Sequence, residues 1–94
     1  MHFGLFTIHF KLNCCTSLKE KRSLLRPLEH RLSRQFNISI AETGFQDNHG
    51  DSELTIGLVN NDLRYIEAEF SRIQTWIESY FPDMLIFDQN IEII

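Results

Sequence analysis

The amino-acid sequence predicts an α+β fold in the order strand, helix, strand, strand, helix, strand. Apolar residues alternate with other residues along 3–12 and again along 54–59, which is the pattern of half-buried strands. Along 17–36 and 63–80 they recur three and four residues apart, which is the pattern of amphipathic helices. Polar segments that contain glycine, asparagine or aspartate separate these stretches and indicate turns.

The first strand is expected over residues 3–12. Its alternation divides the segment into two sets of side chains, one for each side of a sheet. One set suits a core and consists of Gly4, Phe6, Ile8, Phe10 and Leu12. The other set begins apolar and ends polar, and it consists of Phe3, Leu5, Thr7, His9 and Lys11.

The first helix is expected over residues 17–36. Ser17 and Glu20 have capping-box spacing: the Ser17 hydroxyl accepts from the Glu20 N–H, and the Glu20 carboxylate reaches the Ser17 N–H. Pro27 removes one intrahelical hydrogen bond and costs about 3 kcal/mol in a regular helix interior. The apolar stripe keeps its phase across this proline, which favours one kinked helix over two. The stripe consists of Leu18, Leu25, Leu28, Leu32 and Phe36.

The second half of the chain repeats the alternation of strands and helix. Ile38 and Ile40 begin a second strand, and the polar loop 46–52 connects it to a third strand over 54–59. Asn60, Asn61 and Asp62 supply a helix N-cap. The helix that follows ends near Phe81, because Pro82 disfavours helical backbone at the residue before it, and residues 84–94 form a last strand. Its apolar stripe is Leu63, Ile66, Phe70, Ile73, Ile77 and Tyr80.

This order of elements predicts a ferredoxin-like βαββαβ sandwich. Two right-handed crossovers with a hairpin between them place both helices on one face of a four-stranded antiparallel sheet. Residues 1–94 suit a single domain with one core.

Charge is distributed unevenly along the chain. The net charge is −4, yet the segment Lys11–Arg34 holds seven of the nine basic residues and only two of the thirteen acids. A basic helix face on an acidic protein suits nucleic acid, such as RNA phosphates, or an acidic partner, and a merely solvated helix surface is the alternative. The candidate nucleic-acid-binding residues are Lys19, Arg22, Arg26 and Arg34.

The sheet face away from the helices is expected to be too apolar to stay fully exposed to water. We therefore expect a homo-oligomer, most simply a dimer, and a scaffold role is the alternative to RNA binding. The candidate interface consists of Phe3, Leu5, Ala41, Gly57 and Val59, with Ile91 and Ile93 assigned to the same face. Lys21 falls on the apolar side of its helix, and we expect it to pair with the carboxylate of Glu42.

Two stretches resemble one bacterial family. Residues 17–22 (SLKEKR) resemble the SLK[DE]KR signature of YlxP-like proteins, domain of unknown function 503, and residues 36–42 (FNISIAE) are similar to that family's FNVSVAE stretch. The resemblance extends over essentially the whole chain and implies a small cytoplasmic ferredoxin-like domain. Genes of the family often lie beside genes for ribosome maturation and translation initiation, which implies a role near the ribosome. The resemblance supplies no catalytic residues.

No catalytic site, metal site or cofactor is expected. The four histidines have no metal-ligand spacing, and the isolated glycines do not form a phosphate-binding loop. Acylphosphatases share this type of fold but need an anion-binding loop after the first strand, where this chain has NCCT. The adjacent Cys14 and Cys15 are expected to be reduced thiols, because neighbouring cysteines strain a disulfide. No apolar run approaches the roughly 20 residues of a membrane span, so we expect a cytoplasmic protein.

Overall fold

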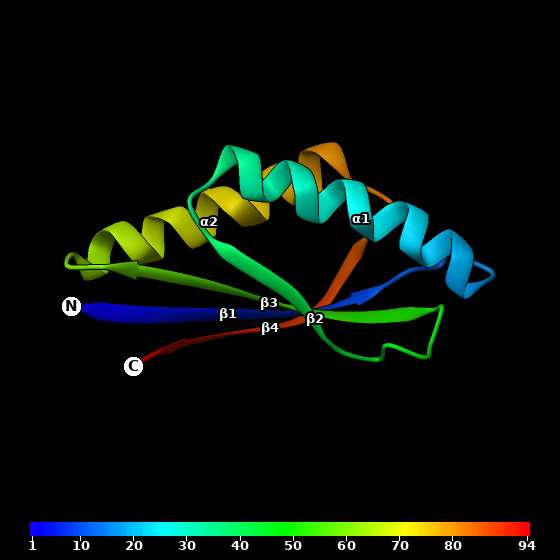
Figure 1. Cartoon of the computed structure of the whole chain (residues 1–94), viewed down its shortest axis with the longest axis horizontal. Helices are drawn as coiled ribbons and strands as arrows, with labels where there is room; N and C mark the ends of the chain where they lie inside the picture. Colours follow the sequence, from blue (N-terminus) through cyan, green and yellow to red (C-terminus); the bar gives the residue numbers. More distant parts are fainter.

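The predicted order of elements is confirmed by the computed structural model, which describes all of residues 1–94. The sheet has the order β2-β3-β1-β4, and every neighbouring pair is antiparallel. Both helices lie on one side of the sheet and leave the other side open (Figure 1). This is the ferredoxin-like sandwich that the sequence predicts. The elements are β1 (His2–Lys11), α1 (Leu18–Gln35), β2 (Ser39–Gly44), β3 (Asp51–Asn60), α2 (Leu63–Tyr80) and β4 (Leu85–Ile93).

One apolar cluster between the helices and the sheet forms the core. The core set predicted for the first strand is buried throughout, and the alternation of β1 and β3 is therefore confirmed. Gly4 is part of this set because α2 lies directly against it. A Cβ at Gly4 would lie 2.6 Å from Cγ2 of Ile66 and 2.9 Å from Cε2 of Phe70.

Helix α1 begins as predicted, with one difference in its cap. The Ser17 hydroxyl accepts from the Glu20 N–H at 3.1 Å. The Glu20 carboxylate does not close the capping box on Ser17, because Thr16 offers it both a backbone N–H at 3.3 Å and a hydroxyl. These hydrogen bonds from Thr16 lower the pKa of Glu20. The helix then continues through Pro27 to Gln35, so one helix rather than two is confirmed.

Helix α2 departs from its predicted stripe at the C-terminal end. Tyr80 is 57% exposed and does not join the core. Phe81 and Met84, which follow the helix, complete the core in its place. Tyr80 instead packs beside Trp76, with ring centroids 5.0 Å apart.

Strand β4 is the outer strand next to β1, and its sidedness corrects one prediction. Ile91 pairs with Phe6 and Ile93 pairs with Gly4, so both isoleucines point to the side that carries the helices. The register shifts between His9 and Phe10, where β4 contains one extra residue. This bulge determines which residues beyond it face the helices, and nothing in the local sequence reveals it. Ile91 and Ile93 are nevertheless 48% and 38% exposed, because β4 lies beyond the helices' cover.

Candidate functional site

Lys21 is the most deeply buried charged residue, with only 2% of its surface exposed. Its position on α1 points the side chain at the loop between β2 and β3. The ammonium lies 2.7 Å from the Glu42 carboxylate, which confirms the predicted pair. It also donates to the backbone carbonyls of Phe45 and Asn48 in this loop and of Asp51 at the start of β3, at distances from 2.6 to 2.7 Å. Lys21 thus ties α1 to the loop and is not available to an external ligand.

The Glu42 carboxylate is held from two sides. It also accepts from the hydroxyl of Ser52 at 2.8 Å, and Ser52 is fully buried. Opposite charges and these hydrogen bonds offset the desolvation that either charge would suffer alone. The Lys21–Glu42 pair therefore has a structural role.

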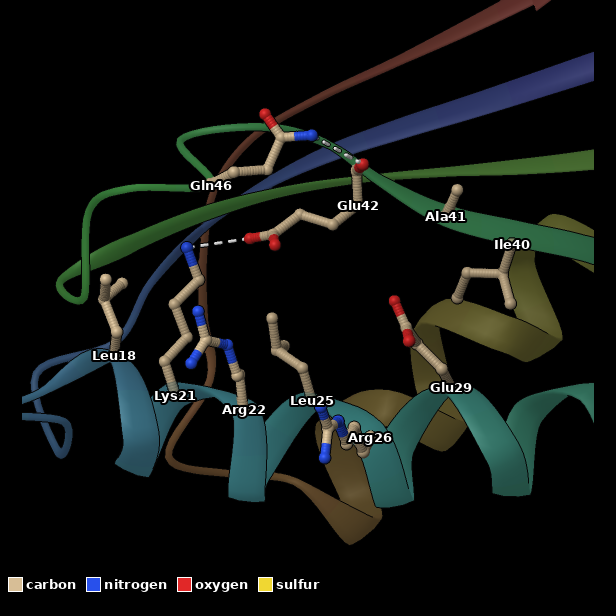
Figure 2. A pocket seen from close by; sticks show the side chains of 10 residues that line it. All are labelled: Leu18, Lys21, Arg22, Leu25, Arg26, Glu29, Ile40, Ala41, Glu42 and Gln46. Carbon is tan, nitrogen blue, oxygen red and sulfur yellow. Dashed lines mark hydrogen bonds and ion pairs between the residues drawn. The ribbon is translucent and has the colours of Figure 1, made fainter.

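A groove of about 490 Å³ lies between α1 and β2. Leu25 and Ile40 contribute apolar side chains to it, and Arg22 and Arg26 line it from the helix (Figure 2). Glu29 also lines this groove, and the pKa of its carboxyl is raised by burial and then by the nearby Glu42. The groove is therefore mixed in charge.

Three of the four predicted nucleic-acid-binding residues lie together. Lys19, Arg22 and Arg26 border a second surface hollow on α1, together with Ser23 and Pro27. We call these three side chains the basic ridge. All three are exposed, and none forms an ion pair, whereas Lys11, Lys21 and Arg72 do.

Arg34, the fourth predicted residue, lies apart from the basic ridge. It lies eight residues beyond Arg26, and this spacing turns it about 80° around the helix axis. The structure places it in a hollow with Arg31, Trp76 and Tyr80. Arg31 is not among the predicted binding residues, and its guanidinium carbon lies over the rings of Trp76 and Tyr80 at 5.2 and 5.1 Å from their centroids.

The predicted interface residues lie on the open face of the sheet. Phe3 and Val59 are 37% and 50% exposed, and Ala41 is also exposed. Leu5 and Gly57 are half-buried. A Cβ at Gly57 would lie 3.4 Å from Cζ of Phe3, so the ring of Phe3 in the same chain is the close neighbour of this glycine.

The opposite end of the open face carries an aromatic row that the sequence patterns did not reveal. The His9 ring stacks on Phe45 with centroids 4.5 Å apart and meets the edge of Phe87 at 5.1 Å. Phe45 lies in a loop at φ 60°, and Phe87 lies at the bulge of β4, so neither belongs to a regular alternation. Asp51 accepts from Lys11 and His9 at 2.8 Å, and these contacts lower its pKa.

The remaining reactive groups do not form a site. Cys14 is exposed and Cys15 is buried. Their sulfurs lie 3.8 Å apart, in contact but without a disulfide bond. Burial and the contact with Cys14 raise the pKa of Cys15 to about 11, which keeps it a thiol. No three histidine, cysteine or acidic side chains converge as they would around a metal ion. Neither helix combines the length and apolarity needed to cross a membrane.

Comparison with known proteins places this chain among proteins of undescribed activity. Residues 3–91 match the family "Protein of unknown function (DUF503)". The uncharacterized protein YlxP of Bacillus subtilis (strain 168) is 37% identical over 68 residues, which cover 72% of this chain and 73% of YlxP. The crystal structure of protein Atu4242 from Agrobacterium tumefaciens superposes on this chain with a TM-score of 0.51 at 13% sequence identity. The match covers 100% of this chain and 91% of the Atu4242 chain. That likeness shows the fold alone.

Proposed function

The chain belongs to the DUF503 family, and we propose that it is an RNA-binding module that docks on phosphates through the basic ridge. One observation carries the proposal. Lys19, Arg22 and Arg26 are exposed and free of carboxylate partners on a chain whose net charge is −4. Arginine and lysine side chains of this kind bind phosphate oxygens in RNA. The proposed ligand is therefore RNA, and the proposed role is binding rather than catalysis. The ribosomal setting is what the family resemblance of the sequence implies.

The open face of the sheet is a poorer site for RNA, in spite of its aromatic row. The side chains of Lys11 and His9 both contact the Asp51 carboxylate. The register also places Glu53 and Asp88 opposite His9 on the same face. Carboxylates repel phosphates, so electrostatic interactions favour RNA binding at α1 over RNA binding at the open face of the sheet.

The proposal predicts binding with little sequence preference and a steep dependence on salt. Three phosphate contacts correspond to a slope of about −2 when log K is plotted against log salt concentration for a single strand. Fluorescence anisotropy with a labelled single-stranded RNA at several salt concentrations measures this slope. Co-sedimentation with ribosomal particles tests the ribosomal setting.

A double charge reversal on α1 and a single reversal on α2 test the location of the site. Arg22→Glu/Arg26→Glu should abolish RNA binding, with little loss of stability at these exposed positions. Arg64→Glu is the control, because Arg64 is exposed on α2 and has no ion pair. The Arg64→Glu variant should retain most of the RNA binding of the parent protein. RNA binding that survives the double reversal, or a parent protein that never binds RNA, would contradict the proposal.

A homo-oligomeric scaffold is the second candidate function, and the open face of the sheet supports it. Phe3 and Val59 form an exposed apolar end there, next to Leu5. In this case light scattering returns twice the mass of one chain, and Val59→Lys returns the mass of one. A dimer without RNA affinity would favour this function over the first.

A further inference from the structure

The outer edge of β4 carries backbone groups with no partner strand. Phe3 and Ile94 exchange both backbone hydrogen bonds, at 3.2 and 2.8 Å. Such pairs alternate along antiparallel strands with pairs whose N–H and C=O groups point away from each other. The register of β1 and β4 is regular from Ile93 to Asp88, so the backbone groups of Gln89, Ile91 and Ile93 point outward. We propose that this edge pairs with the same edge of a second copy of the chain.

Beyond its bulge at Phe87, the β4 edge lacks most of the features that usually protect a sheet edge. Protected edges carry proline, lysine, bulges or a covering element. Residues 88–94 contain no proline or basic residue. Of the outward-pointing backbone groups, the N–H of Gln89 already has a partner, because it donates to the Asp88 carboxylate at 2.9 Å. The opposite edge is different: β2 is shorter, has an irregularity after Glu42, and its Glu42 carbonyl accepts from Gln46.

A second copy fits this edge because residues 88–94 complement themselves in one antiparallel register. With Ile91 of both copies on a two-fold axis, Gln89 faces Ile93, Asn90 faces Glu92, and Asp88 faces Ile94. Each acid therefore meets a neutral residue. Every pair also joins side chains that point to the same side of the sheet, as cross-strand partners must.

The outward backbone groups have their partners in the same register. The two copies of Ile91 exchange two backbone hydrogen bonds, and each Ile93 N–H donates to the Gln89 carbonyl of the other copy. The exposed Ile91 then gains its own copy as an apolar cross-strand neighbour on the side that carries the helices, and Ile93 faces Gln89. The result is one continuous sheet of eight strands, with the basic ridges at a distance from the two-fold axis because β2, not β4, lies beside α1.

Lysine substitutions at two positions of similar exposure test this interface. Ile91 is 48% exposed on the β4 edge, and Val59 is 50% exposed on the open face. Light scattering at micromolar concentration should give twice the mass of one chain for the parent and for Val59→Lys. It should give the mass of one chain for Ile91→Lys, with the far-UV circular dichroism of a folded protein.

Cross-linking tests the register without relying on a disruptive substitution. In a Cys14→Ser/Cys15→Ala background, Ile91→Cys should form a covalent dimer on mild oxidation. Paired residues of this kind have Cα atoms about 5.5 Å apart, within the range of a disulfide. Gln89→Cys should not cross-link to its counterpart, whereas Gln89→Cys together with Ile93→Cys should.

Three outcomes would overturn the proposal. The first is a parent protein with the mass of one chain. The second is a dimer that Val59→Lys dissociates and Ile91→Lys does not, which places the interface on the open face. The third is efficient cross-linking of Gln89→Cys alone with none for Ile91→Cys, which excludes this register. RNA binding is measured separately, so the failure of one proposal leaves the other standing.

Discussion

The Nζ atom of Lys21 lies 2.7 Å from Oε2 of Glu42, across the boundary between α1 and β2. The pair joins two elements that are otherwise separated by a groove. Because the same ammonium binds three backbone carbonyls, one side chain orients both the helix and the turn that follows β2.

Replacing Lys21 should therefore be costly. Lys21→Met leaves the Glu42 carboxylate and the three backbone carbonyls without their donor, and we expect a loss of about 3 kcal/mol in the free energy of unfolding. Lys19→Met is the control, with a change of about 0.5 kcal/mol or less at an exposed position without an ion pair. Urea denaturation measures both. Equal stability of the two variants would contradict the structural role of Lys21.

Glu29 should make stability depend on pH. Its pKa is raised in the folded state, so the stability that this group contributes is present at low pH and is lost as the pH rises through the folded-state pKa. Glu29→Gln should therefore be more stable than the parent at neutral pH, by roughly 0.5 kcal/mol or less given its partial exposure. The difference should vanish well below about pH 4.3, the ordinary pKa of a glutamate.

Thermal unfolding at the two pH values tests the Glu29 prediction. Glu67→Gln is the control for the loss of one negative charge, because Glu67 is exposed on α2 and has no ion pair. An effect of equal size in both variants would mean that net charge, rather than the environment of Glu29, is responsible.

The two glycines that face neighbouring rings should respond differently to alanine. Gly4→Ala would put a Cβ 2.6 Å from Ile66, and overpacking of this kind typically costs about 1 to 3 kcal/mol. Gly57→Ala would put a Cβ 3.4 Å from the Phe3 ring, a contact that needs at most a small shift of this partly exposed side chain. Chemical denaturation of both variants provides the comparison, and a Gly57→Ala variant as unstable as Gly4→Ala would be unexpected.

Pro27 should lower the stability of α1. It lies exposed inside the helix, where proline removes a backbone hydrogen bond. Pro27→Ala should raise the free energy of unfolding by about 1 to 3 kcal/mol, because alanine restores the bond but leaves the unfolded chain more flexible. The midpoint of urea denaturation measures this gain. A variant with unchanged or lower stability would show that α1 is adapted to the proline.

Local patterns in the chain were sufficient to predict much of this protein. The alternation of Phe6, Ile8 and Phe10 marked a half-buried strand, and the spacing of Leu25, Leu28 and Leu32 marked a helix face. The Lys21–Glu42 pair was also predictable, because a lysine on an apolar stripe either extends its ammonium to solvent or meets a carboxylate. Three of the four predicted basic residues lie together in the basic ridge, and Arg34 lines a separate hollow because it lies about two turns further along α1.

The sequence by itself determined the order of the elements, the core side of each regular strand and the asymmetry of charge, because these depend on residues close together in the chain. Only the tertiary structure decided the sidedness of Ile91 and Ile93, the stacking of Phe45 on His9 and the bare edge of β4. The physical reason is that a bulge and a strand register are set by hydrogen bonds between β1 and β4, whose paired residues lie some 70 to 90 positions apart.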